Sequence, residues 1–265
     1  MSPKSALVLA GRRDTSDPLA AAAGVSHRAL LPVGGVPMLV RVLRALRGAR
    51  GIERVHVSIE EPGALRRDTE LARAIDAGWL VVHTSRDSPS KSVLAVLESE
   101  PDESFLVTTA DHALLTPEMV DHFVAAAEAS DADLAVGFVA ASLLQRRYPQ
   151  STRTWLRMRG EAWSGANLFA FRTPRSHAAA RFWVRAEQHR KRPWRLVAAI
   201  GPGLLVAWAL GRLDLNAALE RASARLGARV RAVAMPEAEA AIDVDRASDL
   251  ELATSILAAR EDGRA

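Results

Sequence analysis

Short apolar segments alternate with amphipathic helical segments along most of this chain, and this alternation is the strongest constraint on its fold. The strand-like segments are continuously apolar, which is typical of parallel strands that helices cover on both faces. The pattern therefore predicts an α/β fold with a mostly parallel sheet, whose ligands bind beyond the carboxyl ends of the strands. We expect strands at 5–9, 54–59, 79–83, 105–109, 133–139, 154–158, 167–171, 229–234 and 240–244. We expect helices at about 37–48, 64–77, 91–98, 116–129, 174–190 and 246–260.

Residues 181–226 are helical in composition and interrupt this alternation. We therefore predict a single domain over residues 1–265 with a helical insertion at about 181–226. The apolar stretch at 196–210 is shorter than the roughly 20 residues of a membrane-spanning helix, and a Gly-Pro-Gly sequence breaks it. We interpret the insertion as a helical hairpin packed on the sheet. The alternative is a lid or surface patch for a lipid-like acceptor, with peripheral membrane contact through 185–210, because arginines and tryptophans flank the apolar stretch.

The composition excludes several classes of function. The chain has no cysteine, so disulfides and thiolate metal sites are excluded. Most of its cations are arginines, which suit anionic ligands, but the clearest basic run, 185–195, holds only Trp194 as an aromatic residue and does not indicate nucleic-acid binding. His27, His83 and His112 lack metal-ligand spacing. The first residues contain too short an apolar core for a signal peptide, which predicts a cytoplasmic protein.

The segment ALVLAGRRDT, residues 6–15, has the pattern of a buried strand that runs into an arginine-rich turn. Gly11 lies where the chain must turn, and the backbone amides there would face an anion. A plain turn with solvated arginines would explain this segment alone. Residues 26–46 form a more specific pattern than this turn. Along the chain they contain a cation, an apolar strand, a Gly-Gly turn, a proline and an amphipathic helix.

In this order the sequence resembles the MobA-like NTP transferases, the family of molybdenum-cofactor guanylyltransferase-like nucleotidyltransferases. The family pattern is a strand, LAGG.G.RMG, a lysine and then LLPVGGKPML. Residues 9–11 (LAG) match its first element, and residues 30–39 (LLPVGGVPML) match its last. The similarity continues through TTAD, SGANLFAF at 164–171 and AIDVDRASDL at 241–250. The resemblance implies a Rossmann-like three-layer sandwich with a mostly parallel mixed sheet, the glycosyltransferase-A-like fold of the nucleotide-diphospho-sugar transferases.

The same resemblance implies a nucleotide site, although the phosphate loop departs from the family pattern. The loop is longer here and lacks the second glycine, and the lysine position holds Arg28. Arginine still offers fixed charge to a triphosphate. Lys91 lies in a polar loop that opens a helix, which in the family passes the base and ribose; a capped helix with an exposed lysine explains it equally well. The candidate nucleotide-binding residues are Leu9, Ala10, Gly11, Arg12, Arg13, Arg28, Ser88, Ser90, Lys91 and Ser92.

Asp111 follows an apolar strand, where a carboxylate is favourable only if it projects past the strand end into a polar site. The alternative is a helix cap, but Thr116 is the better N-cap for the helix that follows. The resemblance implies that Asp111 binds Mg²⁺ together with an aspartate of the last predicted strand. Asp243 and Asp245 are both candidates, because alternation places them on the same side of that strand. Asp249 is expected in the first turn of the last helix.

The resemblance further implies a nucleotidyltransferase that transfers a nucleoside monophosphate from an NTP, CTP or GTP, to a phosphorylated acceptor and releases pyrophosphate. In this hypothesis Asp111 binds the metal, Arg13 and Arg28 hold the departing pyrophosphate, and the acceptor contacts Gly165 and Asn167. A turn residue that enters a strand would also explain Asn167. One rival is a sugar-nucleotide glycosyltransferase, but its usual D-x-D motif is absent after the strand at 105–109. The other rival is a non-catalytic nucleotide-binding or regulatory protein, which the altered glycine loop favours.

Overall fold

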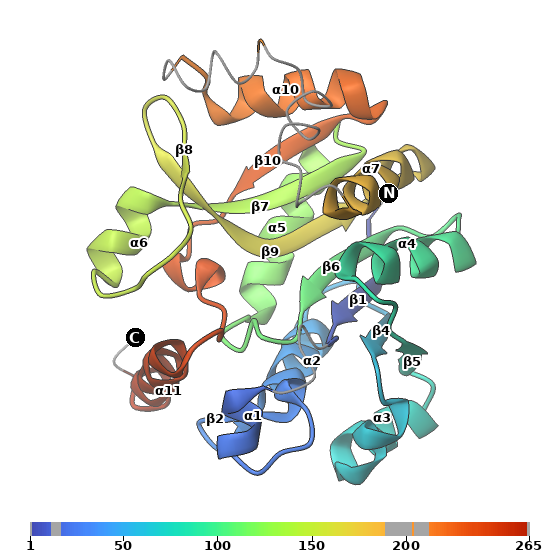
Figure 1. Cartoon of the computed structure of the whole chain (residues 1–265), viewed down its shortest axis with the longest axis vertical. Helices are drawn as coiled ribbons and strands as arrows, with labels where there is room; N and C mark the ends of the chain where they lie inside the picture. The colour runs from blue at the N-terminus through green and yellow to red at the C-terminus, as the bar shows by residue number, and fades with distance from the viewer. Residues whose placement is uncertain (1, 12–16, 189–202, 204–211, 264–265) are drawn as a thin grey trace.

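The computed structural model describes residues 2–11, 17–188, 203 and 212–263, and a mixed sheet runs through the middle of the molecule (Figure 1). Its strands follow the order β10-β7-β9-β6-β1-β4-β5, and β8 pairs with β9. The sheet strands are β1 (Ser5–Leu9), β4 (Arg54–Ile59), β5 (Leu80–Thr84), β6 (Phe105–Thr109), β7 (Leu134–Ala140), β8 (Leu156–Arg157), β9 (Ala162–Phe171) and β10 (Val230–Ala234). A separate small hairpin joins β2 (Pro32–Val33) and β3 (Val36–Pro37).

Most neighbouring strands of the sheet are parallel. β1 pairs in parallel with β4 and β6, β4 with β5, and β7 with β10. β9 is antiparallel to both β6 and β7, which makes the sheet mixed. The predicted α/β fold with a mostly parallel mixed sheet is therefore confirmed.

The helices cover both faces of this sheet. On one face α2 and α5 pack against residues such as Ala6 and Val8 of β1, and on the other α4 and α7 pack against Leu7 (Figure 1). This alternation explains why β1 is continuously apolar from Ala6 to Leu9. The helices are α1 (Pro18–Ala22), α2 (Met38–Gly48), α3 (Thr69–Asp76), α4 (Pro89–Ser99), α5 (Pro117–Ala129), α6 (Ala141–Arg147), α7 (His177–Gln188), α10 (Leu215–Leu226) and α11 (Ala247–Glu261).

The predicted strand at 240–244 is wrong. The 3-10 helix η4 (Ala238–Ala241) ends inside it, and the chain continues as an extended segment that pairs with none of the described strands. Ile242 and Val244 are nevertheless completely buried, because this segment packs into the core beside β6. An apolar run thus gives the same side-chain alternation whether or not its backbone joins a sheet.

Other boundaries also differ from the prediction. β9 begins at Ala162 rather than at 167, and β8 covers only part of the strand expected at 154–158. The short helices α1 and α6 were not expected; Asp17 caps α1 by accepting hydrogen bonds from the amides of Leu19 and Ala20.

Helix α10 lies inside the predicted insertion at 181–226, the second part of α7 overlaps it, and the two helices contact each other. The hairpin, lid and membrane contact considered for 185–210 fall largely on 189–202 and 204–211, which lie outside the described residues. The division into one domain with an insertion therefore stays a prediction. Among the described residues, no helix combines the length and the apolar character needed to cross a membrane.

Candidate active site

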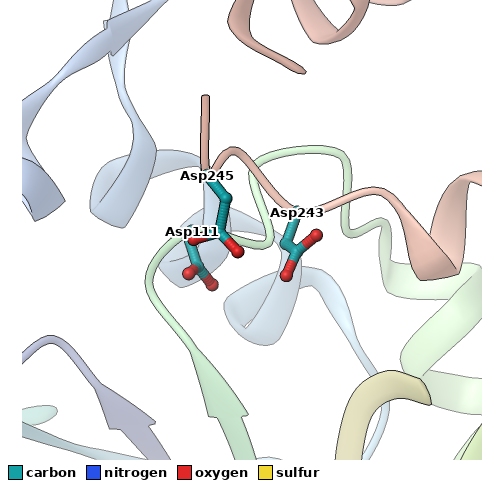
Figure 2. Close-up of side chains that lie close together, drawn as sticks. All are labelled: Asp111, Asp243 and Asp245. Carbon is teal, nitrogen blue, oxygen red and sulfur yellow. The ribbon is translucent and has the colours of Figure 1, made fainter. Parts of the chain in front are cut away.

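Three aspartates meet beyond the carboxyl end of β6. Asp111 follows that strand, and Asp243 and Asp245 come from the extended segment between η4 and α11 (Figure 2). Each offers one carboxylate oxygen, and these atoms all lie within 4.8 Å of one another. The backbone fixes the two segments together, because the Val244 amide donates to the Asp111 carbonyl oxygen at 3.0 Å. We call Asp111, Asp243 and Asp245 the acidic trio.

The local sequence explains why the two later aspartates share a side. Ile242 and Val244 point into the core, so the residues that alternate with them, Asp243 and Asp245, face the other way. The structure thus brings all three predicted metal ligands together although the predicted strand is absent. Three convergent carboxylates supply the hard oxygen donors that Mg²⁺ prefers, so the residues fit a divalent cation.

Arg153 is the main cationic neighbour of the trio. Its Nη1 donates to Asp243 Oδ1 at 2.5 Å, and the Asn167 side-chain amide donates to Asp243 Oδ2 at 3.3 Å. Burial raises the pKa of the Asp243 carboxyl, and the positive charge of Arg153 acts in the opposite direction. Asp249 lies in the first turn of α11, as expected, and accepts from Arg153 Nη2 at 2.9 Å. No local pattern indicated Arg153, because its partners lie 90 and 96 residues away in the chain.

Asn167 is held next to the trio by an irregularity in β9. The register between β7 and β9 shifts between Val136 and Phe138, and Asn167 adopts a φ of 50°. Asparagine is one of the few side chains that tolerate this left-handed conformation. Gly137 faces this part of β9, where a Cβ atom would lie 3.2 Å from the Cβ atoms of Ala166 and Leu168.

Arg28 approaches the trio from the segment that follows the phosphate loop. Its Nη1 donates to Asp17 Oδ2 at 2.9 Å, and its Nη2 donates to the Val244 carbonyl oxygen at 2.7 Å. The same Nη2 lies 3.5 Å from Asp245 Oδ1. Arg28 therefore connects the start of α1 with the segment that carries Asp243 and Asp245, and its side chain remains 24% exposed.

The carboxyl ends of β1, β4 and β5 converge around Gly11. A Cβ atom at Gly11 would lie 3.3 Å from Glu60 Oε1 and 3.7 Å from Ser85 Cβ, so the close approach of these chain segments favours glycine. Buried His27 hydrogen-bonds Glu60 Oε2 through Nε2 at 2.9 Å, while its Nδ1 accepts from the Ala29 amide. Leu9 and Ala10 lead into this turn, and Arg12 and Arg13 lie outside the described residues.

The predicted base and ribose segment forms the start of α4. Ser88 is its N-cap, and Lys91 Nζ donates to Asp87 Oδ2 at 2.6 Å. Ser90 and Ser92 are buried; Ser90 donates to Glu187 of α7, and Ser92 accepts from the backbone amide of residue 86. The three predicted hydroxyls thus have structural partners: Ser88 caps α4, Ser90 connects α4 to α7, and Ser92 binds the loop before the helix.

A cleft of about 470 Å³ adjoins the trio on the side of β8 and β9. Asp243 and Asp245 form part of its wall together with both residues predicted to contact the acceptor. Sequence reasoning missed three lining residues, the half-buried Trp155 and Trp163 and the exposed Arg246, because nothing in their local pattern distinguishes them. We call this the aromatic cleft. Its lining residues include Thr152, Arg153, Thr154, Trp155, Trp163, Gly165, Asn167 and Arg246.

Comparisons with known proteins agree with this arrangement. The family model described as MobA-like NTP transferase domain matches residues 6–229. A hypothetical transferase from Thermus thermophilus is 32% identical, with a TM-score of 0.76 over 94% of this chain and 100% of that chain. A CMP:2-keto-3-deoxy-manno-octonic acid synthetase solved with CTP shares the fold at 15% identity, with a TM-score of 0.56 over 97% of this chain and 99% of that chain. No curated protein matches the sequence.

Proposed function

The chain belongs to the MobA-like NTP transferase domain family, and we propose that it transfers a nucleoside monophosphate from CTP or GTP to a phosphorylated acceptor. It is a nucleotidyltransferase; the identities of the NTP and of the acceptor class are our proposal. The observation that carries the proposal is the position of the acidic trio, which contacts Arg28 through Asp245 and lines the aromatic cleft through Asp243 and Asp245.

The reaction needs little acid–base chemistry from the protein. An oxygen of the acceptor phosphate attacks the α-phosphorus of the NTP, and a new P–O bond forms. The bond from the α-phosphorus to the oxygen that bridges to the β-phosphorus breaks, and pyrophosphate leaves with the electron pair. The acceptor phosphate is already ionised near neutral pH, so the residues act by positioning the reactants and by offsetting their charge.

We assign the acidic trio to a divalent cation, Mg²⁺. Asp111, Asp243 and Asp245 would hold it, and when bound it supplies positive charge that offsets the charge on the NTP phosphates. Arg28 already lies at Asp245, and its guanidinium is partly exposed, so it would hold the departing pyrophosphate together with Arg13.

We assign the β1 turn and the start of α4 to the nucleotide. The turn at Gly11 would present backbone amides to the phosphates, and Ser88 and Lys91 would lie along the base and ribose. The aromatic cleft would receive the acceptor. Its exposed Arg246 suits an acceptor phosphate, and the rings of Trp155 and Trp163 suit an apolar or planar part of a small-molecule or lipid-like acceptor.

A pyrophosphate-release screen tests this proposal. The full chain is incubated with each of the four NTPs, Mg²⁺ and a set of phosphorylated acceptors, and pyrophosphate is measured with a coupled assay. We expect release that requires all three components and is highest with CTP or GTP. Thermal stabilisation by an NTP without any release would instead support a non-catalytic nucleotide-binding protein. Release of a nucleoside diphosphate from a sugar nucleotide would support a glycosyltransferase.

A further inference from the structure

The guanidinium of Arg153 is buried beside the acidic trio and has a partner at each of its three nitrogens. Nη1 donates to Asp243 Oδ1, Nη2 donates to Asp249 Oδ1 at 2.9 Å, and Nε donates to Ser151 Oγ at 3.2 Å. The side chain is only 6% exposed. A buried arginine that bridges two carboxylates through separate N–H groups is fixed in both position and orientation.

The bridge extends to the backbone that carries the trio. Asp249 Oδ2 accepts hydrogen bonds from the amides of Asp245 and Arg246, at 3.2 and 3.0 Å. Arg153 therefore reaches Asp243 directly and the backbone of Asp245 through Asp249. Both later members of the trio are thus linked to the same side chain, Asp243 directly and Asp245 through Asp249.

The same arginine belongs to the wall of the aromatic cleft. It lies between Thr152 and Thr154 and precedes Trp155, and all four residues line the cleft. The segment runs from the end of α6 to β8, and among the described residues its sheet pairing begins only at Leu156. The contacts of Arg153 thus anchor a cleft wall that lacks sheet pairing to the metal-binding carboxylates.

We infer that Arg153 is a positioning residue that couples the aromatic cleft to the acidic trio, so that metal binding and the arrangement of the cleft wall change together. This inference rests on the proposed function of the trio as a metal site. This coupling requires a side chain that bridges Asp243 and Asp249. A lysine would keep the positive charge of Arg153 but lose the bridge, because it has one ammonium group in place of the planar guanidinium.

The test is Arg153→Lys, and Arg159→Lys is its matched control. Arg159 makes the same kind of contact on the surface, to Asp214 at 3.3 Å, and is 65% exposed. Each chain is labelled with 5-fluorotryptophan, and the Trp155 resonance is assigned with Trp155→Phe. Fluorine NMR then follows the Trp155 resonance during a titration with Mg²⁺ alone, so the readout needs neither turnover nor a known acceptor.

We expect the Trp155 resonance of the wild-type chain and of Arg159→Lys to shift with Mg²⁺ at the same midpoint. In Arg153→Lys we expect the midpoint to rise about tenfold or more and the shift to shrink, as is typical when a residue that orients a metal ligand is changed. Circular dichroism checks that each variant is folded. If Arg153→Lys is unstable, Asp249→Asn, which removes the other end of the bridge, is expected to raise the midpoint in the same way.

An unchanged midpoint and an unchanged shift in a folded Arg153→Lys chain would overturn the inference and leave the proposed function in place. A wild-type Trp155 resonance that does not respond to Mg²⁺ would overturn it as well. Failure of the proposed function is observed separately, as the absence of pyrophosphate release from the wild-type chain.

Discussion

Two arginines contact the segment that carries Asp243 and Asp245, one from each side of the sheet. The two arginines differ in their surroundings. Arg28, on the side of β1, β4 and β5, is 24% exposed; it bonds Asp17 and the neutral carbonyl group of Val244 and reaches Asp245 only at 3.5 Å. Arg153, on the side of β7 and β9, is 6% exposed and bonds two carboxylates. A partly exposed guanidinium with a neutral partner can exchange that partner for a phosphate, whereas breaking a buried ion pair is strongly unfavourable.

In the proposed function, this difference separates an open half of the site, which we assign to the nucleotide, from a fixed half, which we assign to the acceptor. On the nucleotide half, the loop after β1 departs from the family pattern and the guanidinium of Arg28 remains accessible. On the acceptor half the cleft wall is tied to the carboxylates.

The largest expected effect follows from Asp111→Asn, which should disable both halves together. Asparagine keeps the shape of the side chain but removes the anionic oxygen that Mg²⁺ requires. We expect pyrophosphate release to fall by orders of magnitude and Mg²⁺-dependent stabilisation by nucleotide to be lost. The metal-free protein should keep or gain thermal stability, because a carboxylate near other aspartates is unfavourable until a cation binds. A helix-capping role would give the reverse pattern, with near-normal activity and about 1 kcal/mol or less of lost stability.

Acid should destabilise the region around β4 and β5, which holds His56 and His83, before it affects Asp133. Burial lowers the pKa of His56, in β4, to about 4, and the neighbouring His83 adds to the effect. The unfolded chain protonates this histidine near its ordinary pKa of 6.5, so the free energy of unfolding falls as the pH drops from about 6.5 to 4. The contribution of His56 is at most about 3 kcal/mol. Asp133, in the acceptor half, has a pKa of about 2 in spite of its burial, because Arg229 and Thr173 bond it; its contribution is lost only as the pH falls from 3.8 toward 2.

Urea unfolding at several pH values checks this order. In His56→Gln the free energy of unfolding should depend less on pH between 6.5 and 4 than in the wild type. Hydrogen exchange at pH 5 should show lower protection in β4 and β5 than in β7 and β10. Equal pH dependence in the two proteins would contradict the assignment to His56.

Substitutions of Arg28 should affect the nucleotide half alone. Arg28→Ala should weaken NTP binding by about 1.5–3 kcal/mol, because a charged contact to the phosphates is lost. Arg28→Lys should lose much less, since a positive charge remains. Calorimetric titration with a non-hydrolysable NTP measures both. If the two variants bind as tightly as the wild type, Arg28 does not contact the nucleotide.

The smallest expected effect concerns the start of α4. Ser88→Ala removes the N-cap and should cost about 1 kcal/mol of stability in thermal or urea unfolding. If Ser88 also lies along the ribose, NTP affinity should fall as well, while Ser88→Asn should restore the cap without restoring that affinity. A loss of stability alone, with unchanged NTP affinity in both variants, would assign Ser88 purely to capping.

Local sequence patterns were sufficient to predict most strands of the sheet and the three aspartates of the acidic trio. The strands at 5–9, 54–59 and 105–109 have the predicted bounds, because continuous apolar runs between turns define buried strands. Asp243 and Asp245 lie on one side, as alternation indicates, although the expected strand at 240–244 is absent. Pairing with a neighbouring strand depends on the whole sheet and cannot be inferred from one segment.

The contacts between side chains that are distant in the sequence could not be predicted. Arg153 meets Asp243 across 90 residues of sequence, and His27 meets Glu60 across 33. The left-handed conformation of Asn167 likewise arises from a register shift between β7 and β9. Contacts of this kind follow from tertiary packing, which leaves no periodic trace in the sequence.

Equilibrium binding of Mn²⁺ shows whether the acidic trio binds the divalent cation that we propose for nucleotidyl transfer. Electron paramagnetic resonance measures free Mn²⁺ in the presence of the wild-type chain, of Asp111→Asn and of Arg159→Lys, each without nucleotide. We expect the wild type and Arg159→Lys to bind Mn²⁺, Mg²⁺ to displace it, and folded Asp111→Asn to bind it at least tenfold more weakly. Binding by Asp111→Asn that equals the wild type would contradict the account.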